Sequence, residues 1–158
     1  MILVVLGTQD KRFDRLLKVV EHAVEAGWIQ EEVMVQAGCT TFESTKMNVV
    51  DYVDMTTFEQ WMSQCRLLIT HGGVGTIMSA LRQKKPVIAC PRLAKYGEHH
   101  NDHQCEIIET FYEKGYLIPL RDEETLEKAL LQAEQFQVPE VMSNNQKMIE
   151  LLMNYLEL

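Results

Sequence analysis

A glycine-rich turn at residues 71–76 has the residue types that bind a phosphate or a diphosphate. The turn consists of His71, Gly72, Gly73, Val74, Gly75 and Thr76. Glycines let backbone N–H groups approach an anion closely, and a following helix directs the positive end of its dipole at the same place. Glycine turns occur in many folds, so this turn alone is weak evidence for phosphate binding. The polar run that follows at 101–104 makes it stronger.

Predicted elements flank the turn in a regular order. The apolar run 66–70 predicts a short buried strand, 77–82 predicts a helix, and 86–90 predicts a second strand. A polar loop then ends in Asn101, Asp102, His103 and Gln104. The sequence therefore predicts strand, glycine turn, helix, strand and polar loop.

Strands and helices alternate along the rest of the chain. Further strands are predicted at 2–6, 33–35, 48–53 and 116–120. Further helices are predicted at 13–24, at 58–62 after a cap at Thr56 or Thr57, at 107–111, from Asp122 to about 136, and at 144–156. The continuous apolar run 2–6 is typical of a central strand buried on both faces. This alternation predicts an α/β fold with a Rossmann-like, mostly parallel sheet and helices on both faces.

Several polar or glycine-containing turns follow the predicted strands. Ligands of parallel sheets bind beyond the carboxyl ends of the strands. The turns that fall at that edge are Gly7-Thr8, 36–38, 71–76, Pro91-Arg92 and 101–104. The sequence therefore predicts one crevice into which these turns converge.

Size and composition limit the function classes. The 158 residues are consistent with a single domain, 1–158. A net charge of −8 argues against non-specific nucleic-acid binding and against direct docking to an anionic membrane. The four cysteines form no CxxC pair, and we see no signal peptide and no apolar run long enough to span a membrane. We therefore expect a cytoplasmic protein that binds no metal through its cysteines.

The pattern at 71–104 resembles the donor-nucleotide half of two-domain (GT-B) glycosyltransferases. The wider pattern, from Gly7-Thr8 to Gly115, is similar to the C-terminal domain of glycosyltransferase family 28. The run 91–104, PRLAKYGEHHNDHQ, resembles the PssE-like small soluble subunits of split glycosyltransferases in bacterial polysaccharide synthesis. The resemblance implies one half of a GT-B enzyme that uses a UDP-sugar.

The resemblance also implies roles for individual residues. His71 and the 72–76 turn would bind the donor diphosphate, and Gly7 and Thr8 would border the reacting centre. Pro91 and Arg92 are expected to lie beside the uracil. Asp102 and Gln104, in the loop that also carries Asn101, are expected to recognise the sugar hydroxyls. Alternatives that need no ligand remain: His71 could cap the turn, Asp102 could cap a helix and Gln104 could be a surface residue.

Ser79 departs from the family pattern. Related sequences often carry Glu at this position, and that Glu holds the ribose hydroxyls. A serine can make one such hydrogen bond but not a charge-assisted pair. The ribose contact is therefore weaker in this chain, if Ser79 makes it.

Sugar transfer requires stabilisation of a leaving diphosphate and a base for the acceptor. Helix N–H groups and a histidine can supply the first, which suggests a reaction without a metal or a cofactor. The only approach to an Asp-x-Asp metal motif is Asp122 with Glu124, and those acids fit a helix start. Candidates for the base are Glu98, His99 and the adjacent His100. It is equally consistent with the sequence that His99 and His100 are solvated loop residues without a function.

A chain of this length supplies one wall of a donor crevice. The resemblance therefore implies a membrane-anchored partner that brings a lipid-linked saccharide acceptor to the cytoplasmic face, in capsule or exopolysaccharide synthesis. A second hypothesis is a non-catalytic subunit that binds a UDP-sugar or stimulates a separate transferase. A dinucleotide oxidoreductase fits less well, because Gly7-Thr8-Gln9 lacks the G-x-G-x-x-G pattern.

Overall fold

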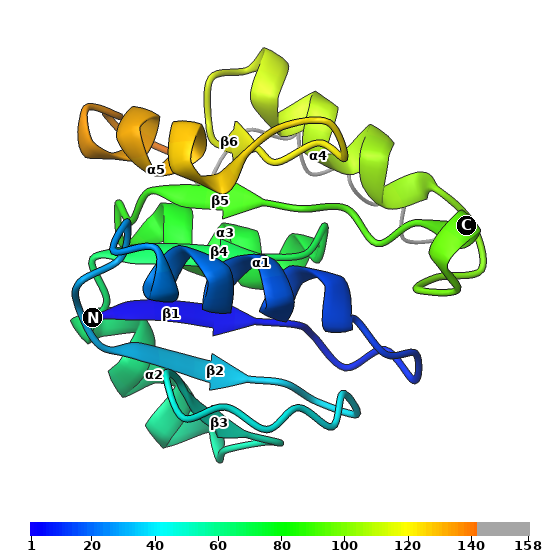
Figure 1. The fold of residues 1–158 in the computed structure, drawn as a ribbon. Helices are drawn as coiled ribbons and strands as arrows, with labels where there is room; N and C mark the ends of the chain where they lie inside the picture. The colour runs from blue at the N-terminus through cyan, green and yellow to red at the C-terminus, as the bar shows by residue number, and fades with distance from the viewer. Residues whose placement is uncertain (142–158) are drawn as a thin grey trace.

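The computed structural model describes residues 1–141, so the helix predicted at 144–156 lies outside the described residues. These residues form a six-stranded sheet in the order β3-β2-β1-β4-β5-β6, with every neighbouring pair parallel (Figure 1). The strands are β1 (Ile2–Val5), β2 (Val33–Gln36), β3 (Asn48–Val50), β4 (Leu67–Thr70), β5 (Val87–Ala89) and β6 (Ile118–Pro119). The predicted α/β fold and the central position of the first strand are confirmed.

Within residues 1–141, five α-helices cover the two faces of this sheet. Helices α1 (Asp14–Glu25) and α5 (Leu126–Glu134) pack on one face. The other face is covered by α2 (Met55–Gln64), α3 (Val74–Arg82) and α4 (His103–Glu113). Figure 1 shows the two layers with the sheet between them.

The alternation of side chains along each strand builds two cores. In β1, Ile2 and Val4 face α1, whereas Leu3 and Val5 face the layer of α2, α3 and α4. All four side chains are buried, because a parallel sheet with helices on both faces exposes neither side of a central strand. Burial of apolar side chains on both faces therefore stabilises the central strands of the sheet.

Three helix starts differ from the sequence prediction. Helix α2 is capped by Asp54, whose carboxylate accepts a hydrogen bond from the Thr57 N–H, and not by Thr56 or Thr57. Helix α5 begins at Leu126 after a Thr125 cap and not at Asp122. The Asp122 carboxylate instead contacts Lys95 and Tyr96. Helix α3 begins at Val74, which places the second half of the glycine turn inside its first turn.

The register of the central strands sets the position of the glycine turn. Val5 of β1 lies beside Thr70 of β4, so the turns that leave these strands start side by side. The Thr70 hydroxyl donates a buried hydrogen bond of 2.7 Å to the Val5 carbonyl. This contact holds Gly7 next to His71.

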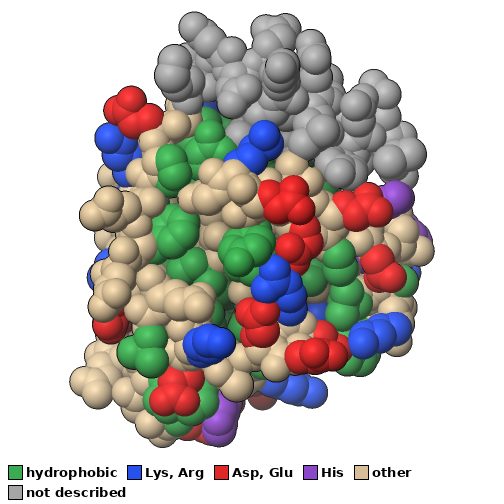
Figure 2. Space-filling view, turned by 90° about the horizontal axis from the view of Figure 1, so that it is seen from above, with side chains coloured by type: hydrophobic (Ala, Val, Ile, Leu, Met, Phe, Trp, Pro, Cys, Tyr) green, Lys and Arg blue, Asp and Glu red, His purple; other side chains and the backbone are tan. Residues whose placement is uncertain are grey.

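The outer surface is mixed in charge. On the face shown in Figure 2, acidic and basic side chains are interspersed among the residues drawn in colour. Of the helices that lie within residues 1–141, none has the length and apolar character needed to cross a bilayer.

Candidate functional site

His71 occupies a narrow space between two glycines at the carboxyl edge of the sheet. A Cβ placed on Gly7 would lie 2.2 Å from His71 Nε2, and one placed on Gly73 would lie 2.5 Å from it. Gly7 also has φ +79°, a conformation that other residues rarely adopt. Both glycines are therefore needed for the imidazole to lie where it does.

Gln104 connects His71 to two backbone segments. The Gln104 Oε1 accepts hydrogen bonds from the Gly72 N–H at 2.9 Å and from the Arg92 N–H at 3.1 Å, and its Nε2 lies 3.0 Å from His71 Nδ1. His71 and Gln104 are both 5% exposed. The Gln104 oxygen thus has both lone pairs occupied and is unavailable to a sugar hydroxyl, which narrows the predicted sugar role to the amide nitrogen.

The environment of His71 keeps its ring neutral. Burial lowers the pKa of His71 to about 3, and the positive charge of Arg92 acts in the same direction. A buried neutral imidazole beside a helix N-terminus can donate a hydrogen bond without carrying a charge.

The structure corrects the position expected for Arg92. Its guanidinium is 1% exposed and lies over the Phe13 ring. It donates hydrogen bonds to the carbonyls of Leu6, Lys11 and Glu98. Pro91 is also buried, and its carbonyl accepts from Arg15. Both residues hold loops together, so their side chains are not the wall of a base pocket.

The structure also corrects the expectation that Glu98 is an accessible base. Its buried carboxylate accepts two hydrogen bonds from Arg15, at 2.9 and 3.0 Å, and one from the Leu93 N–H at 3.0 Å. Glu98 fastens the 91–98 segment to α1.

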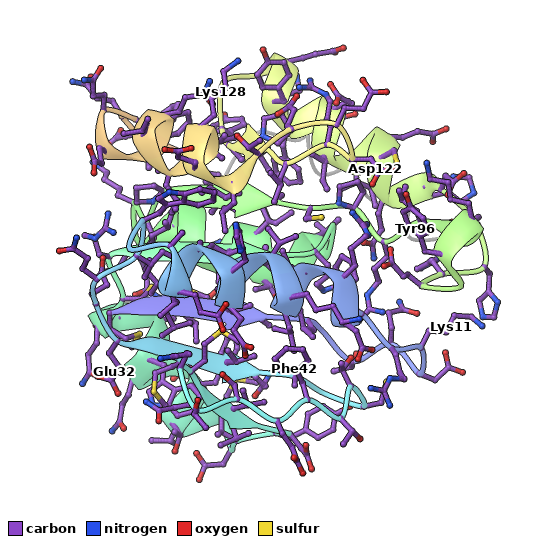
Figure 3. The ribbon with its side chains drawn as sticks, viewed as in Figure 1. Lys11, Glu32, Phe42, Tyr96, Asp122 and Lys128 are labelled. Carbon is purple, nitrogen blue, oxygen red and sulfur yellow. The ribbon has the colours of Figure 1, made fainter. Side chains whose placement is uncertain are left out.

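A second set of contacts secures the same segment from the other side. The short 3₁₀ helix η1 (Ala94–Tyr96) carries Tyr96, whose hydroxyl donates to Asp122 at 2.8 Å, and Lys95 pairs with Asp122 at 2.9 Å (Figure 3). These contacts explain why Asp122 is not part of the α5 start.

Two hollows lie on either side of the N-terminus of α3. The first, here the His71 hollow, has a volume of about 260 Å³. Its polar lining residues are Gln9, His71, His99, Asn101, His103 and Gln104, together with Gly72, Gly73 and Val74 of the turn. Of the polar residues predicted for the site, this hollow brings together His71, His99, Asn101 and Gln104.

The loop residues differ in how they meet the His71 hollow. His99 lines it, and its Nδ1 accepts a hydrogen bond of 3.3 Å from the Asn101 N–H. Burial lowers the pKa of His99, and Arg92 contributes in the same direction. Asp102 lies outside this lining: its carboxylate accepts from the Ala94 N–H at 2.8 Å, although it occupies the N-cap position of α4.

The second hollow, here the Tyr52 hollow, has a volume of about 430 Å³. It is lined by the predicted residues Gly7, Thr8, Gly75, Thr76 and Ser79, and by Val5, Gln36, Tyr52, Val53, Met55, Phe58 and Glu59. The sequence prediction missed Tyr52, Val53 and Phe58. The signal that could have found Tyr52 and Val53 is their place directly after the third strand, at the edge where the other turns meet; Phe58 lies in α2.

The N-terminus of α3 between the hollows presents free N–H groups. The first bond in the helix runs from the Ile77 N–H to the Gly73 carbonyl, and no side chain within residues 1–141 caps the start. Backbone N–H groups in this position, with the helix dipole behind them, are suited to an anion. Within the same residues, no three His, Cys, Asp or Glu side chains are grouped so as to hold a metal ion.

The comparisons with known proteins agree with this fold. The model of the "Glycosyltransferase family 28 C-terminal domain" matches residues 1–153. The chain belongs to this family. Among proteins with curated descriptions, none matches the sequence of this family member.

Solved structures show the same fold in parts of larger glycosyltransferases and in one protein of similar size. The glycotransferase of kitacinnamycin is 18% identical with a TM-score of 0.63, covering 98% of this chain but 37% of its own length. ALG13 is 19% identical with a TM-score of 0.59, covering 96% of this chain and 94% of its own. The glycosyltransferase VinC, in complex with DTDP, is 17% identical with a TM-score of 0.54, covering 99% of this chain and 40% of its own. This family member therefore spans well under half of the two larger enzymes.

Proposed function

We propose that this chain binds the diphosphate of a UDP-sugar at the N-terminus of α3. The observation that supports the proposal is the convergence of uncapped N–H groups with the buried, neutral ring of His71. Both supply hydrogen-bond donors to phosphate oxygens without a metal ion. The presence of DTDP in the VinC structure is consistent with a nucleoside diphosphate at such a site.

The chemistry of the hollows orients the donor. The Tyr52 hollow has aromatic and apolar walls, Tyr52, Val53 and Phe58, which suit a uracil ring, and Ser79 lies there to meet the ribose. The His71 hollow has His99, Asn101 and His103, which suit sugar hydroxyls. The diphosphate then spans the start of α3 from one hollow to the other.

Within this arrangement, we propose a metal-independent hexosyl transfer. The acceptor oxygen attacks the anomeric carbon, the bond from that carbon to the diphosphate oxygen breaks, and the N–H groups of α3 stabilise the charge that develops on the leaving UDP. Attack from the opposite side inverts the anomeric centre. His99 remains the candidate base in this chain, because it lines the His71 hollow, whereas Glu98 is fully paired.

The proposal extends to a partner. We propose a membrane-anchored subunit that completes the crevice and presents a lipid-linked saccharide, with UDP-galactose, UDP-glucose or a related UDP-hexose as the donor. The setting would be the cytoplasmic face of the inner membrane, in capsule or exopolysaccharide synthesis. The structural match covers nearly all of this chain and nearly all of ALG13. This supports the proposal that the donor-binding half of a glycosyltransferase is a separate protein here.

The alternative is a non-catalytic subunit that binds a UDP-sugar for a separate transferase. The pairing of Glu98 with Arg15 favours this alternative, because Glu98 is bound by Arg15 and lies outside the lining of the His71 hollow, where His99 is the proposed base. With a purified partner, His71→Ala should abolish transfer if this chain carries the donor site and should leave substantial transfer if it does not.

The first test is calorimetric titration of the isolated protein with UDP. We expect wild-type binding to weaken by about tenfold or more in His71→Ala, because one hydrogen bond to a charged group is lost. The matched control is His22→Ala, which removes an exposed histidine of α1 whose ring makes an edge-to-face contact with Trp28. Equal affinity in wild type and His71→Ala would refute the placement of the diphosphate.

A further inference from the structure

The Gln104 side chain has an orientation that its surroundings determine. Two backbone N–H groups, from Gly72 and Arg92, point at one amide atom. That atom must be the oxygen, because a reversed amide would direct its NH₂ group at two other donors. The amide nitrogen consequently faces His71.

This orientation decides where His71 carries its proton. The Gln104 nitrogen can only donate, and it lies 3.0 Å from His71 Nδ1. Nδ1 must therefore be the unprotonated acceptor. A neutral imidazole has one ring proton, so the proton resides on Nε2.

The Nε2–H group points toward the start of α3. Nε2 lies against Gly7 and Gly73, and Gly73 is the N-cap residue of α3. Among residues 1–141, no group accepts a hydrogen bond from Nε2. A ring that is 95% buried thus presents one unused donor beside the free N–H groups of α3.

We propose that Gln104 is a positioning residue that fixes His71 in the Nε2–H tautomer, so that the ring donates a hydrogen bond to a diphosphate oxygen of the ligand. The identity of the ligand rests on the proposed function, whereas the tautomer does not. Gln104 then acts through His71 and not by contact with a sugar.

The charged and titratable groups around the ring are few. Arg92 and His99 face it from the segment after β5, and His103 of α4 lines the same hollow. The turn after β1 contributes only uncharged residues, Gly7 and Gln9. Because burial lowers the pKa of His71 to about 3, the ring stays neutral between pH 5 and pH 8. The tautomer, and not the charge, is the property that Gln104 controls in that range.

The direct test is nitrogen-15 NMR of the histidine rings in the full chain. We expect wild-type His71 to show a protonated Nε2 and an unprotonated Nδ1 from about pH 5 to about pH 8. Gln104→Glu keeps the shape and can still accept from Gly72 and Arg92. Its second oxygen can only accept, so the His71 proton should move to Nδ1 and the pKa of His71 should rise by about two pH units.

Two further variants keep this test decisive. Gln132→Glu makes the same change of charge on the exposed side of α5 and should leave the His71 signals unchanged. Gln104→Met keeps the length without any hydrogen bond and should give a mixture of tautomers. A wild-type ring protonated on Nδ1, or a His71 signal that is the same in every Gln104 variant, would overturn the inference.

Ligand binding provides a second readout. A UDP-hexose is the suitable probe, because its diphosphate is esterified at both ends and does not titrate between pH 5 and pH 8. Because His99 and His103 line the same hollow, the affinity of Gln104→Glu is compared with that of wild type at the same pH. Gln104→Glu should bind about tenfold more weakly than wild type at pH 8, and this difference should shrink at pH 5, as Nε2 regains its proton. Binding by Gln104→Glu that is equally weakened relative to wild type at both pH values would contradict the role of the tautomer.

The two readouts separate the inference from the proposed function. The expected tautomer in a protein that binds neither UDP nor a UDP-hexose would refute the function and leave the role of Gln104 in place. Binding by a protein whose His71 is protonated on Nδ1 would refute the role of Gln104 and leave the function in place.

Discussion

The two hollows beside α3 differ in how firmly their walls are held. Buried hydrogen bonds fix the walls of the His71 hollow, since Gln104 joins His71, Gly72 and Arg92. The Tyr52 hollow has outer walls that are open to solvent, with Tyr52 54% exposed and Met55 70% exposed. The same helix terminus therefore separates a pre-organised polar hollow from an open, largely apolar one.

This difference suggests a division of roles in the proposed donor site. Polar groups that must recognise hydroxyls or oxygens lose selectivity if they can move, so fixing them in advance favours one geometry. Apolar contact with a flat base tolerates adjustment, so exposed side chains suffice there. We therefore expect mutations in the His71 hollow to affect both stability and binding, and mutations in the Tyr52 hollow to affect mainly binding.

The largest expected effect comes from Gly7→Ala. The new Cβ would overlap His71 Nε2, and φ +79° would strain any side chain. We expect the free energy of unfolding to fall by about 3 kcal/mol in chemical denaturation. UDP binding should fall by at least about a hundredfold, because the ring is displaced.

Gly115→Ala is the matched control for Gly7→Ala. Gly115 has φ +77°, but a Cβ there would have no atom within 4 Å. In Gly115→Ala, backbone strain alone should lower the free energy of unfolding by about 1 kcal/mol. UDP binding should be unchanged. If the two variants lose the same amount of stability, close packing of Gly7 against His71 does not contribute to the stability of the protein.

An intermediate effect is expected from acidification. The pKa of His71 is about 3 in the folded chain and about 6.5 when exposed, so the unfolded chain binds more protons between these values. Stability should therefore decrease as the pH falls below about 6.5, by about 2 kcal/mol at about pH 5 from this group. Denaturation of wild type and His71→Gln at both pH values measures the difference.

His22→Gln controls for the removal of an exposed histidine and should keep the wild-type dependence on pH. If His71→Gln also keeps the wild-type dependence, His71 is accessible to protons in the folded chain and its hollow is less closed than its contacts indicate.

The smallest expected effect comes from Tyr52→Ala. Because Tyr52 is mostly exposed, the free energy of unfolding should change by less than about 0.5 kcal/mol. UDP binding should weaken by about fivefold through loss of contact with the base, as measured by calorimetry. A large loss of stability would show that the open hollow is part of the core, and unchanged binding would place the base elsewhere.

The sequence predicted the parts of the site that depend on local pattern. The apolar runs gave the strands, and the glycine turn between a strand and a helix gave the start of α3 at the edge where ligands bind. Pattern also identified His71, Gly75, Thr76 and Ser79, which the structure brings to the two hollows. These positions follow from chain order, because parallel strands end at one edge.

The sequence could not predict which polar residues of the 91–104 loop face inward. Arg92 and Glu98 look equally available as ligands in the sequence, but their partners, Leu6 and Arg15, come from the other end of the chain. A long-range partner leaves no local pattern. Tyr52 was missed for a different reason: the sequence analysis placed it inside a strand predicted at 48–53, but β3 ends at Val50 and leaves Tyr52 in the loop that follows.

Local apolar pattern, glycine position and chain order by themselves determined the α/β fold, the edge that carries the site and the turn at its centre. The tertiary structure decided the roles of Gln104, Arg92 and Glu98. Burial forces each polar group to find a partner, and those partners are set by the meeting of distant segments rather than by neighbours in the chain.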